Sequence, residues 1–236
     1  MNYKLIRDLI FPPRCAVCDE LLCLGKGLVC QKCRPKIRYI QEPRCFKCGK
    51  EVSDVEEEYC FDCQRKKRSY IQGFPCMAYL PPVSDAVVRM KYHNRPEYAE
   101  FYGGEIARIF KDEFKKRAIE ALIPVPLHIK RFQKRGYNQA LLLAKEIEKL
   151  TKIPVKTDIL YRSSDTLAQK KLSNDERENN LKDAFSAVRT NEDLNTVLIV
   201  DDIYTTGATI EACSLALKKI GIENIYYTSV CIGNVV

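Results

Sequence analysis

Four cysteine pairs of the form CxxC lie within the first 63 residues of this 236-residue chain and constrain its fold more than any other feature. A CxxC pair places two thiolates where both can bind one tetrahedral metal ion, and two pairs complete a four-thiolate site. The sequence therefore predicts two zinc ions, with a structural role because a closed four-thiolate site leaves no open position for catalysis. The eight predicted ligands are Cys15, Cys18, Cys30, Cys33, Cys45, Cys48, Cys60 and Cys63.

The spacing alone leaves open which pairs share an ion. First with second and third with fourth both have the form CxxC, eleven residues, CxxC, and this equality favours sequential pairing. Interleaved pairing, first with third and second with fourth, is also compatible with the spacing, and Cys23 is an alternative ligand. Gly49, directly after Cys48, suits the tight turn of a zinc knuckle.

The expected compartment argues against a disulfide framework. Disulfides need an oxidising environment, whereas the apolar start of this chain is interrupted by Arg7 and Asp8 and does not resemble a secretory signal. No run reaches the roughly 18 to 20 apolar residues of a membrane span. We therefore expect a cytoplasmic protein without membrane insertion. The net charge of +8 permits contact with nucleic acid but does not require it.

A change in pattern predicts two domains. Residues 1–70 hold all four pairs among Pro, Gly and basic residues and are expected to form a cysteine-rich zinc-binding domain. From about residue 74, helical and strand-like segments alternate, so residues 71–236 are expected to form an α/β domain with an open, mostly parallel sheet and flanking helices. The boundary is placed between Gln64 and Pro75.

Within the second domain, periodicity and capping signals locate the elements. The strand at 196–200 is apolar on both faces, which is typical of the middle of a parallel sheet. Ser173 and Glu176 stand in capping-box relation before a short helix to Leu181. The other expected helices cover 85–93, 96–116, 139–150 and 209–220, and the other expected strands cover 121–126, 153–161 and 224–232.

The segment VLIVDDIYTTGAT, residues 197–209, has the composition of a site for a phosphorylated sugar. Asp201 and Asp202 are expected at the end of the apolar strand, where two carboxylates suit hydroxyl groups or a divalent cation. Backbone N–H groups at the start of the next helix, together with the helix dipole, favour a phosphate. The loop residues are Thr205, Thr206, Gly207, Ala208 and Thr209.

This thirteen-residue segment resembles the phosphoribosyl-pyrophosphate signature of type I phosphoribosyltransferases. The resemblance implies that the acidic pair Asp201 and Asp202 holds the ribose hydroxyls. It also implies that the loop from Thr205 to Thr209 holds the 5′-phosphate, with magnesium accompanying the ligand. The expected fold is then the type I phosphoribosyltransferase fold, preceded by the zinc module.

The stretch IPVPLHIKRFQKRGYNQALLLA, residues 123–144, extends the resemblance to the ComF family, and the likeness covers nearly all of the chain. By this resemblance Lys130, Arg131 and Arg135 face the diphosphate. Arg135 opens the family-typical motif RGYNQ, although a capped helix N-terminus also accounts for it. Lys91 and Tyr92 also fit the family pattern, and an ordinary helix end explains them equally well.

Two further regions carry weaker expectations. The polar run from Leu160 to Leu181 resembles the family's flexible loop, which closes over substrate in related enzymes, although a solvated loop without a role is an alternative. The positions that fit the family pattern are Arg162, Thr166, Gln169, Leu172, Arg177 and Asn180. His93 and His128 are the only histidines, and neither is expected to be a catalytic base.

Three functions follow from the resemblance. The first is a phosphoribosyltransferase, for which the sequence identifies neither a catalytic residue nor an acceptor. The second is an accessory role in DNA uptake during natural transformation, with single-stranded DNA and competence-machinery proteins as partners. The third is a non-catalytic sensor of phosphoribosyl pyrophosphate. The basic residues around the cysteines supply a face for DNA, or the zinc module is only a stabilising cap.

Overall fold

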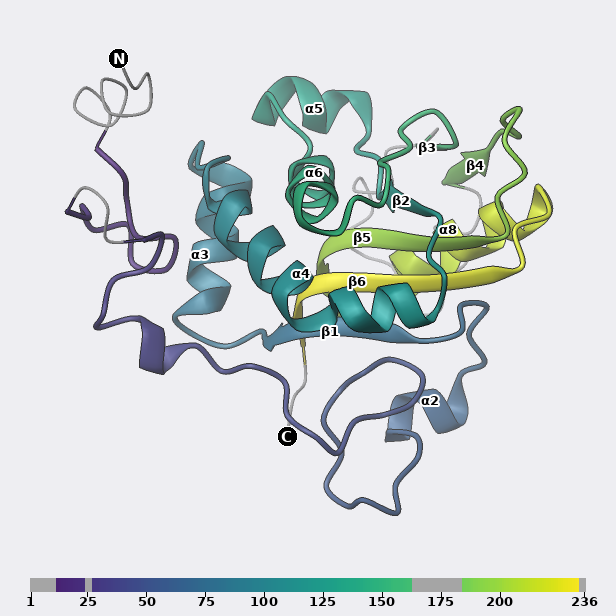
Figure 1. Ribbon diagram of the computed structural model, residues 1–236, viewed down its shortest axis with the longest axis horizontal. Helices are drawn as coiled ribbons and strands as arrows, with labels where there is room; N and C mark the ends of the chain where they lie inside the picture. Colours follow the sequence, from purple (N-terminus) through teal and green to yellow (C-terminus); the bar gives the residue numbers. More distant parts are fainter. Residues whose placement is uncertain (1–11, 24–26, 163–183, 234–236) are drawn as a thin grey trace, which may run out of the picture.

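A four-stranded parallel sheet in the order β1-β6-β5-β2 lies at the centre of the computed structural model, which describes residues 12–23, 27–162 and 184–233 (Figure 1). The sheet strands are β1 (Gly73–Ala78), β2 (Ala121–Pro124), β5 (Thr196–Tyr204) and β6 (Asn224–Ile232). A separate antiparallel pair consists of β3 (Leu160–Arg162) and β4 (Phe185–Ala187).

Helices cover both faces of this sheet, as expected for a parallel sheet. In the described residues they are η1 (Arg34–Lys36), α2 (Phe61–Arg65), α3 (Val83–Tyr92), α4 (Tyr98–Lys116), α5 (Ile129–Arg135), α6 (Gln139–Thr151) and α8 (Ala208–Lys219). None of the helices in this part of the chain is long and apolar enough to cross a bilayer.

Two hydrophobic cores form on the two faces, since successive side chains of a strand point to opposite sides. Leu198 and Val200 of β5 join the core that contains α3, α4 and most of the buried face of α6. Val197 and Ile199 join the core that contains α8. Each core also includes cysteines of the N-terminal segment, so that segment packs on both faces of the sheet.

The cysteine-rich segment reaches both faces by passing along the outer edge of β1 (Figure 1). Tyr39 forms an antiparallel bridge with Met77, and the backbone N–H of Ile40 donates to Cys76 O at 3.1 Å. These contacts cover the edge strand, whose backbone groups would otherwise be open to another chain. The segment before the bridge, with the first four CxxC cysteines, packs with α3 and α4. The segment after the bridge, with the last four, packs with β6.

The open, mostly parallel α/β sheet agrees with the expectation from the sequence, and β6 spans the residues expected for it. Two strands differ. The apolar run predicts that β5 ends at Val200, but it continues to Tyr204 because Asp201, Ile203 and Tyr204 pair with β6. The strand expected at 153–161 is reduced to a bridge between Val155 and Leu122, with β3 beginning at Leu160.

The helix expected from Ser173 to Leu181 lies outside the described residues, as does most of the expected flexible loop.

Candidate ligand site and zinc centres

The two segments expected to bind the ligand leave the sheet side by side. β2 and β5 are parallel, with Pro124 opposite Val200, so their carboxyl ends lie at the same edge. The backbone N–H of Val125 donates to Val200 O at 3.0 Å, and Asn138 Nδ2 donates to Val125 O at 3.0 Å. Asn138 of the RGYNQ motif, at the N-terminus of α6, is thereby held next to the end of β5 that carries Asp201 and Asp202.

The loop after β5 has the geometry of an anion site. Gly207 adopts φ +78°, in the left-handed region that favours glycine, and precedes the first residue of α8. A Cβ atom at this position would lie 2.2 Å from Tyr204 Oη, so a side chain is also excluded by contact. Thr205 and Thr206 are exposed, which leaves their hydroxyls open to a ligand at the N-terminus of α8.

Lys91 forms an ion pair with the acidic pair. It lies near the end of α3, and its Nζ is 2.9 Å from Asp202 Oδ1, with both side chains mostly buried. Burial acts to lower the pKa of Lys91, but the Asp202 carboxylate outweighs burial and raises the pKa. Lys91 therefore stays charged and partly neutralises the acidic pair. From the sequence, the family pattern and an ordinary helix end explained Lys91 equally well.

Arg135 contacts the end of α3 next to Lys91, through Tyr92. Its guanidinium lies 4.7 Å from the centre of the Tyr92 ring and donates to Gln139 Oε1 at 2.9 Å. Tyr137 Oη donates to Met90 O at 2.5 Å, which ties RGYNQ to the end of α3. Gln139 is 1% exposed, and its Nε2 has no acceptor within the described residues.

The other residues predicted for this region lie on α5, on β3 or outside the described residues. Lys130 is exposed on α5, where its backbone N–H donates to His128 Nδ1 at 3.4 Å. Arg131 is half-buried on the same helix. Arg162 stacks on Phe185 at 5.1 Å. The other loop positions of the family pattern, Thr166, Gln169, Leu172, Arg177 and Asn180, lie outside the described residues.

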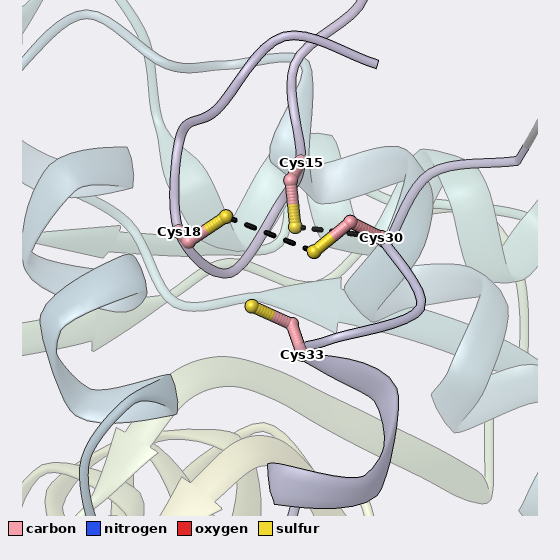
Figure 2. Close-up of side chains that lie close together, drawn as sticks. All are labelled: Cys15, Cys18, Cys30 and Cys33. Atoms are coloured by element: carbon pink, nitrogen blue, oxygen red, sulfur yellow. Dashed lines mark hydrogen bonds between the residues drawn. The ribbon is translucent and has the colours of Figure 1, made fainter. Parts of the chain in front are cut away.

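The first cysteine site brings Cys15, Cys18, Cys30 and Cys33 together, with all four sulfur atoms within 4.8 Å of one another (Figure 2). Cys18 Sγ and Cys30 Sγ are 3.9 Å apart, close to the edge of about 3.8 Å that a ZnS4 tetrahedron has. Burial acts to raise the pKa of Cys15, but backbone N–H donors outweigh it and lower the pKa to about 7, which favours the thiolate.

The second site has the same construction with Cys45, Cys48, Cys60 and Cys63. Cys48 Sγ and Cys60 Sγ are 3.6 Å apart, which again fits tetrahedral zinc. The cysteines are therefore grouped sequentially, and Cys23 is exposed and belongs to neither group. Gly49 forms the knuckle turn with φ +71°, as its position predicts.

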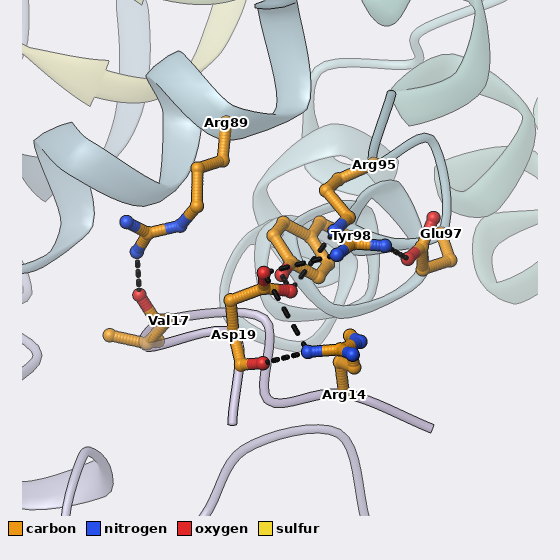
Figure 3. A network of polar contacts seen from close by, with 7 residues as sticks. All are labelled: Arg14, Val17, Asp19, Arg89, Arg95, Glu97 and Tyr98. Carbon is orange, nitrogen blue, oxygen red and sulfur yellow. Dashed lines mark hydrogen bonds and ion pairs between the residues drawn. The ribbon is translucent and has the colours of Figure 1, made fainter. Parts of the chain in front are cut away.

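Asp19 takes the place of that glycine in the first site. Its φ is +67°, and its side chain ties the knuckle to the helices (Figure 3). Tyr98 Oη donates to Asp19 Oδ1, and Arg95 Nε lies 3.0 Å from the same carboxylate. Arg89 donates to the carbonyl of Val17. The first site is therefore fixed to α3 and the start of α4.

Comparison with known proteins agrees with both halves of this description. Residues 6–64 match the family model of the double zinc ribbon domain. Over 156 residues the chain is 37% identical to Competence protein F of Haemophilus influenzae, a match that covers 62% of this chain and 66% of that protein. The chain is similar in sequence to this ComF-type competence protein. It thus spans slightly less than two thirds of this relative's length.

Two more distant relatives extend the ComF-like match. The DNA utilization protein YhgH of Salmonella typhimurium is 29% identical over 160 residues, covering 65% of this chain and 68% of that protein. Competence protein ComFC of Bacillus subtilis is 27% identical over 145 residues, covering 61% and 56%. The crystal structure of a purine phosphoribosyltransferase from Pyrococcus horikoshii Ot3 superposes with a TM-score of 0.32 and 20% identity, over 58% of this chain and 72% of that chain.

Asp201 makes the stability of this ComF-like chain depend on pH. Burial, and then the neighbouring Asp202, raise the pKa of Asp201 to about 7 from 3.8, although Lys91 acts to lower it. The folded chain thus holds a proton that the unfolded chain releases near pH 4. Its contribution to the free energy of unfolding is fully present below about pH 4 and is lost as the pH rises to about 7.

Asp201→Asn is therefore expected to raise the free energy of unfolding at pH 8, by roughly 2 to 4 kcal/mol, and to have little effect at pH 4. Urea denaturation at both pH values, without added magnesium or phosphate, checks this. Asp193→Asn, at an acid outside the site, is the control. Equal effects of Asp201→Asn at the two pH values would contradict the burial of a protonated carboxyl.

The site also contains residues that the sequence did not indicate. Arg68 Nη2 donates to Thr206 O at 2.6 Å, and the Tyr70 and Tyr204 hydroxyl oxygens are 2.8 Å apart. These contacts join positions more than 130 residues apart, so no local spacing or capping signal marks them.

Proposed function

We propose that this ComF-like chain binds phosphoribosyl pyrophosphate with magnesium at the carboxyl edge of β2 and β5. The observation that supports the proposal is the order in which carboxylates, hydroxyls and a helix N-terminus follow one another along the chain. Two mostly buried carboxylates, Asp201 and Asp202, are followed at once by exposed threonine hydroxyls and a left-handed glycine at a helix N-terminus. This order matches a ribose with adjacent hydroxyl groups and a phosphate on its fifth carbon.

The charges at the edge suit the two ends of that ligand. The dipole of α8 and the exposed loop amides favour the 5′-phosphate. The Arg135 guanidinium supplies a donor for the diphosphate. Carboxylate oxygens are the ligands that Mg²⁺ prefers in proteins, so Asp201 and Asp202 suit either the ribose hydroxyls or the ion. Bound magnesium would neutralise charge that develops on the leaving diphosphate.

In its enzymatic form, the proposal is a phosphoribosyl transfer. The bond between the anomeric carbon and the diphosphate breaks, the diphosphate leaves with the electron pair, and an acceptor nucleophile bonds to the carbon. The chain's own contribution is to hold the phosphate and the diphosphate on opposite sides of the sugar. Lys91 would hold the Asp202 carboxylate in place through their ion pair.

Ligand fragments test the two halves of this site separately. Arg135→Gln is expected to weaken the binding of diphosphate with Mg²⁺ about tenfold, because a charged hydrogen bond is lost. It is expected to leave the affinity for ribose 5-phosphate unchanged. Lys134→Gln, at the exposed neighbouring cation on α5, is the matched control. If both variants weaken diphosphate equally, or if Arg135→Gln also weakens ribose 5-phosphate, the assignment of Arg135 is wrong.

We further propose a cytoplasmic role in DNA uptake and natural transformation, with single-stranded DNA or competence-machinery proteins as partners. The proposal is supported by the names of the relatives, which describe competence and DNA utilization proteins. Many basic residues of the zinc module contact other protein groups, as Arg38 does with Glu51 and Arg44 with Ile40 O. Lys32, Arg34 and Lys36 are exposed around η1 and form the best face for phosphates.

A non-catalytic DNA-handling role is distinguished by salt dependence. The change of Lys32, Arg34 and Lys36 to alanine is expected to reduce single-stranded DNA affinity and the slope of its salt dependence. The same change should leave phosphoribosyl pyrophosphate binding intact. Fluorescence anisotropy of a labelled oligonucleotide over a series of salt concentrations measures both quantities. Unaltered affinity and slope would exclude this face.

A further inference from the structure

Three packed tyrosines lie between the second zinc site and the loop from Thr205 to Thr209, which is called the phosphate loop from here on. Tyr204 is the last residue of β5 and directly precedes Thr205. Its ring stacks on the Tyr227 ring, with ring centres 4.8 Å apart and planes 11° apart. Tyr70 packs edge-on against Tyr227 at 5.1 Å, and its hydroxyl oxygen is 2.8 Å from that of Tyr204. All three side chains are buried.

This tyrosine cluster, Tyr70, Tyr204 and Tyr227, touches both functional parts. Tyr227 Oη donates to the backbone carbonyl of Cys48 at 2.7 Å, and Cys48 is a ligand of the second zinc site. On the other side, the Tyr204 hydroxyl fills the space beside Gly207 in the phosphate loop. One zinc ligand and the loop glycine are therefore connected through side chains that have no room to move independently.

The segment that follows the last zinc ligand makes a second connection. Arg68 Nη2 donates to the carbonyl of Thr206 at 2.6 Å. The backbone N–H and the hydroxyl of Ser69 donate to the Glu211 carboxylate at 2.8 and 2.6 Å. Because Glu211 lies in the first turn of α8, residues 68–70 hold the phosphate loop on both sides of Gly207.

The first zinc site is attached elsewhere and provides an internal comparison. Its knuckle is fixed to α3 and α4 through Arg89, Tyr98 and Tyr102, whose hydroxyl donates to Ala16 O at 2.9 Å. Cys15 and Cys33 belong to the core on that face of the sheet, whereas Cys45, Cys48 and Cys60 belong to the core that contains the tyrosine cluster.

We propose that residues 68–70 and the tyrosine cluster position the phosphate loop, so that zinc in the second site and an anion in the loop strengthen each other's binding. The ligand part of this proposal rests on the proposed function. Fixing a loop costs conformational entropy, and a zinc site that fixes it in advance removes that cost from ligand binding. Linkage requires the reverse effect to have the same size. Among the described residues, the first site has no such connection to the loop.

The zinc side is tested without any ligand, on the full-length zinc-loaded chain. A chelator and a thiol-alkylating reagent are added, and mass spectrometry follows the alkylation of each cysteine peptide. Tyr204→Phe removes one hydroxyl from the loop side and leaves the ring. It is expected to speed the labelling of Cys48, Cys60 and Cys63 about fivefold, the value of one lost buried hydrogen bond.

In the same Tyr204→Phe experiment the peptides of the first site should label at the wild-type rate, and the buried Cys213 and Cys231 should stay protected, which reports that the chain is folded. Tyr98→Phe, which removes the hydroxyl beside Asp19, is the matched control and should speed only the first site. Unchanged labelling of the second site in Tyr204→Phe, or an equal increase in both sites, would overturn the coupling.

The ligand side uses ribose 5-phosphate, which probes the loop alone. Saturating ribose 5-phosphate is expected to slow labelling of the second site and not of the first, and Arg68→Gln is expected to reduce its affinity about fivefold or more. If the wild type binds ribose 5-phosphate but neither effect occurs, the positioning role is wrong. If the wild type binds no sugar phosphate, the proposed function fails, while the ligand-free labelling of Tyr204→Phe still decides whether loop and zinc are coupled.

Discussion

Replacing Cys48 with serine is expected to release one of the two zinc ions and to lower the melting temperature by about 10 °C or more. Zinc binding to a closed four-thiolate site contributes roughly 10–16 kcal/mol in zinc-finger peptides, which is comparable with the stability of a whole domain. Cys48 is 1% exposed and lies in the core that contains the tyrosine cluster. Loss of this ligand therefore affects the sheet as well as the knuckle.

Metal analysis and thermal unfolding by circular dichroism measure the two effects of Cys48→Ser. Cys23→Ser is the matched control, because Cys23 is an exposed cysteine of the same module outside both sites. It should keep two zinc ions per chain and the wild-type melting temperature. A Cys48→Ser protein with both ions and an unchanged melting temperature would show that the second site does not support the fold.

Gly207→Ala is expected to cost roughly 2 to 5 kcal/mol of unfolding free energy and to abolish ligand binding by the loop. Part of the cost comes from φ +78°, which a residue with a Cβ atom adopts only with strain. The rest comes from the Tyr204 hydroxyl, which stands 2.2 Å from the Cβ position and is itself held by Tyr70. Relief of that contact has to move the loop or the tyrosine cluster.

Gly27→Ala separates the two contributions. Gly27 has φ +84°, but no described atom outside its chain neighbours lies within 4 Å of its Cβ position, so this variant carries the backbone strain alone. Urea denaturation of both variants should therefore show the larger loss for Gly207→Ala, by about 1 to 3 kcal/mol. Equal losses would mean that the loop accommodates a methyl group and that Tyr204 does not confine it.

Local signals in the sequence predicted much of this fold. The side chain of Asn138 caps α6 by accepting from the backbone N–H of Ala140, as its position before the apolar stripe indicates. β6 covers its expected residues because they are rich in the aromatic and β-branched side chains that favour strands. The equal spacing of the CxxC pairs favoured the sequential grouping that the structure has. Each of these features is encoded within about a dozen residues.

Contacts between distant segments could not be predicted in this way. β5 extends past its apolar run because pairing with β6 continues to Tyr204, and the sequence of β5 does not contain that information. The pairing of Tyr39 with Met77 along the sheet edge and the contact of Arg68 with Thr206 depend on how the zinc module packs. The sequence located the acidic pair and the loop through a family motif, but not the support behind them.

The most direct test of the proposed ligand site is a calorimetric titration of phosphoribosyl pyrophosphate with Mg²⁺ into the zinc-loaded wild type and into the Asp201→Asn, Asp202→Asn double variant. The amide side chains keep the shape of the pair and remove its charge. Saturable binding with one site per chain is expected for the wild type, and no measurable binding for the folded double variant. A folded wild type that releases no heat of binding, or a double variant that binds as tightly as the wild type, would contradict the assignment of this edge of the sheet as the ligand site.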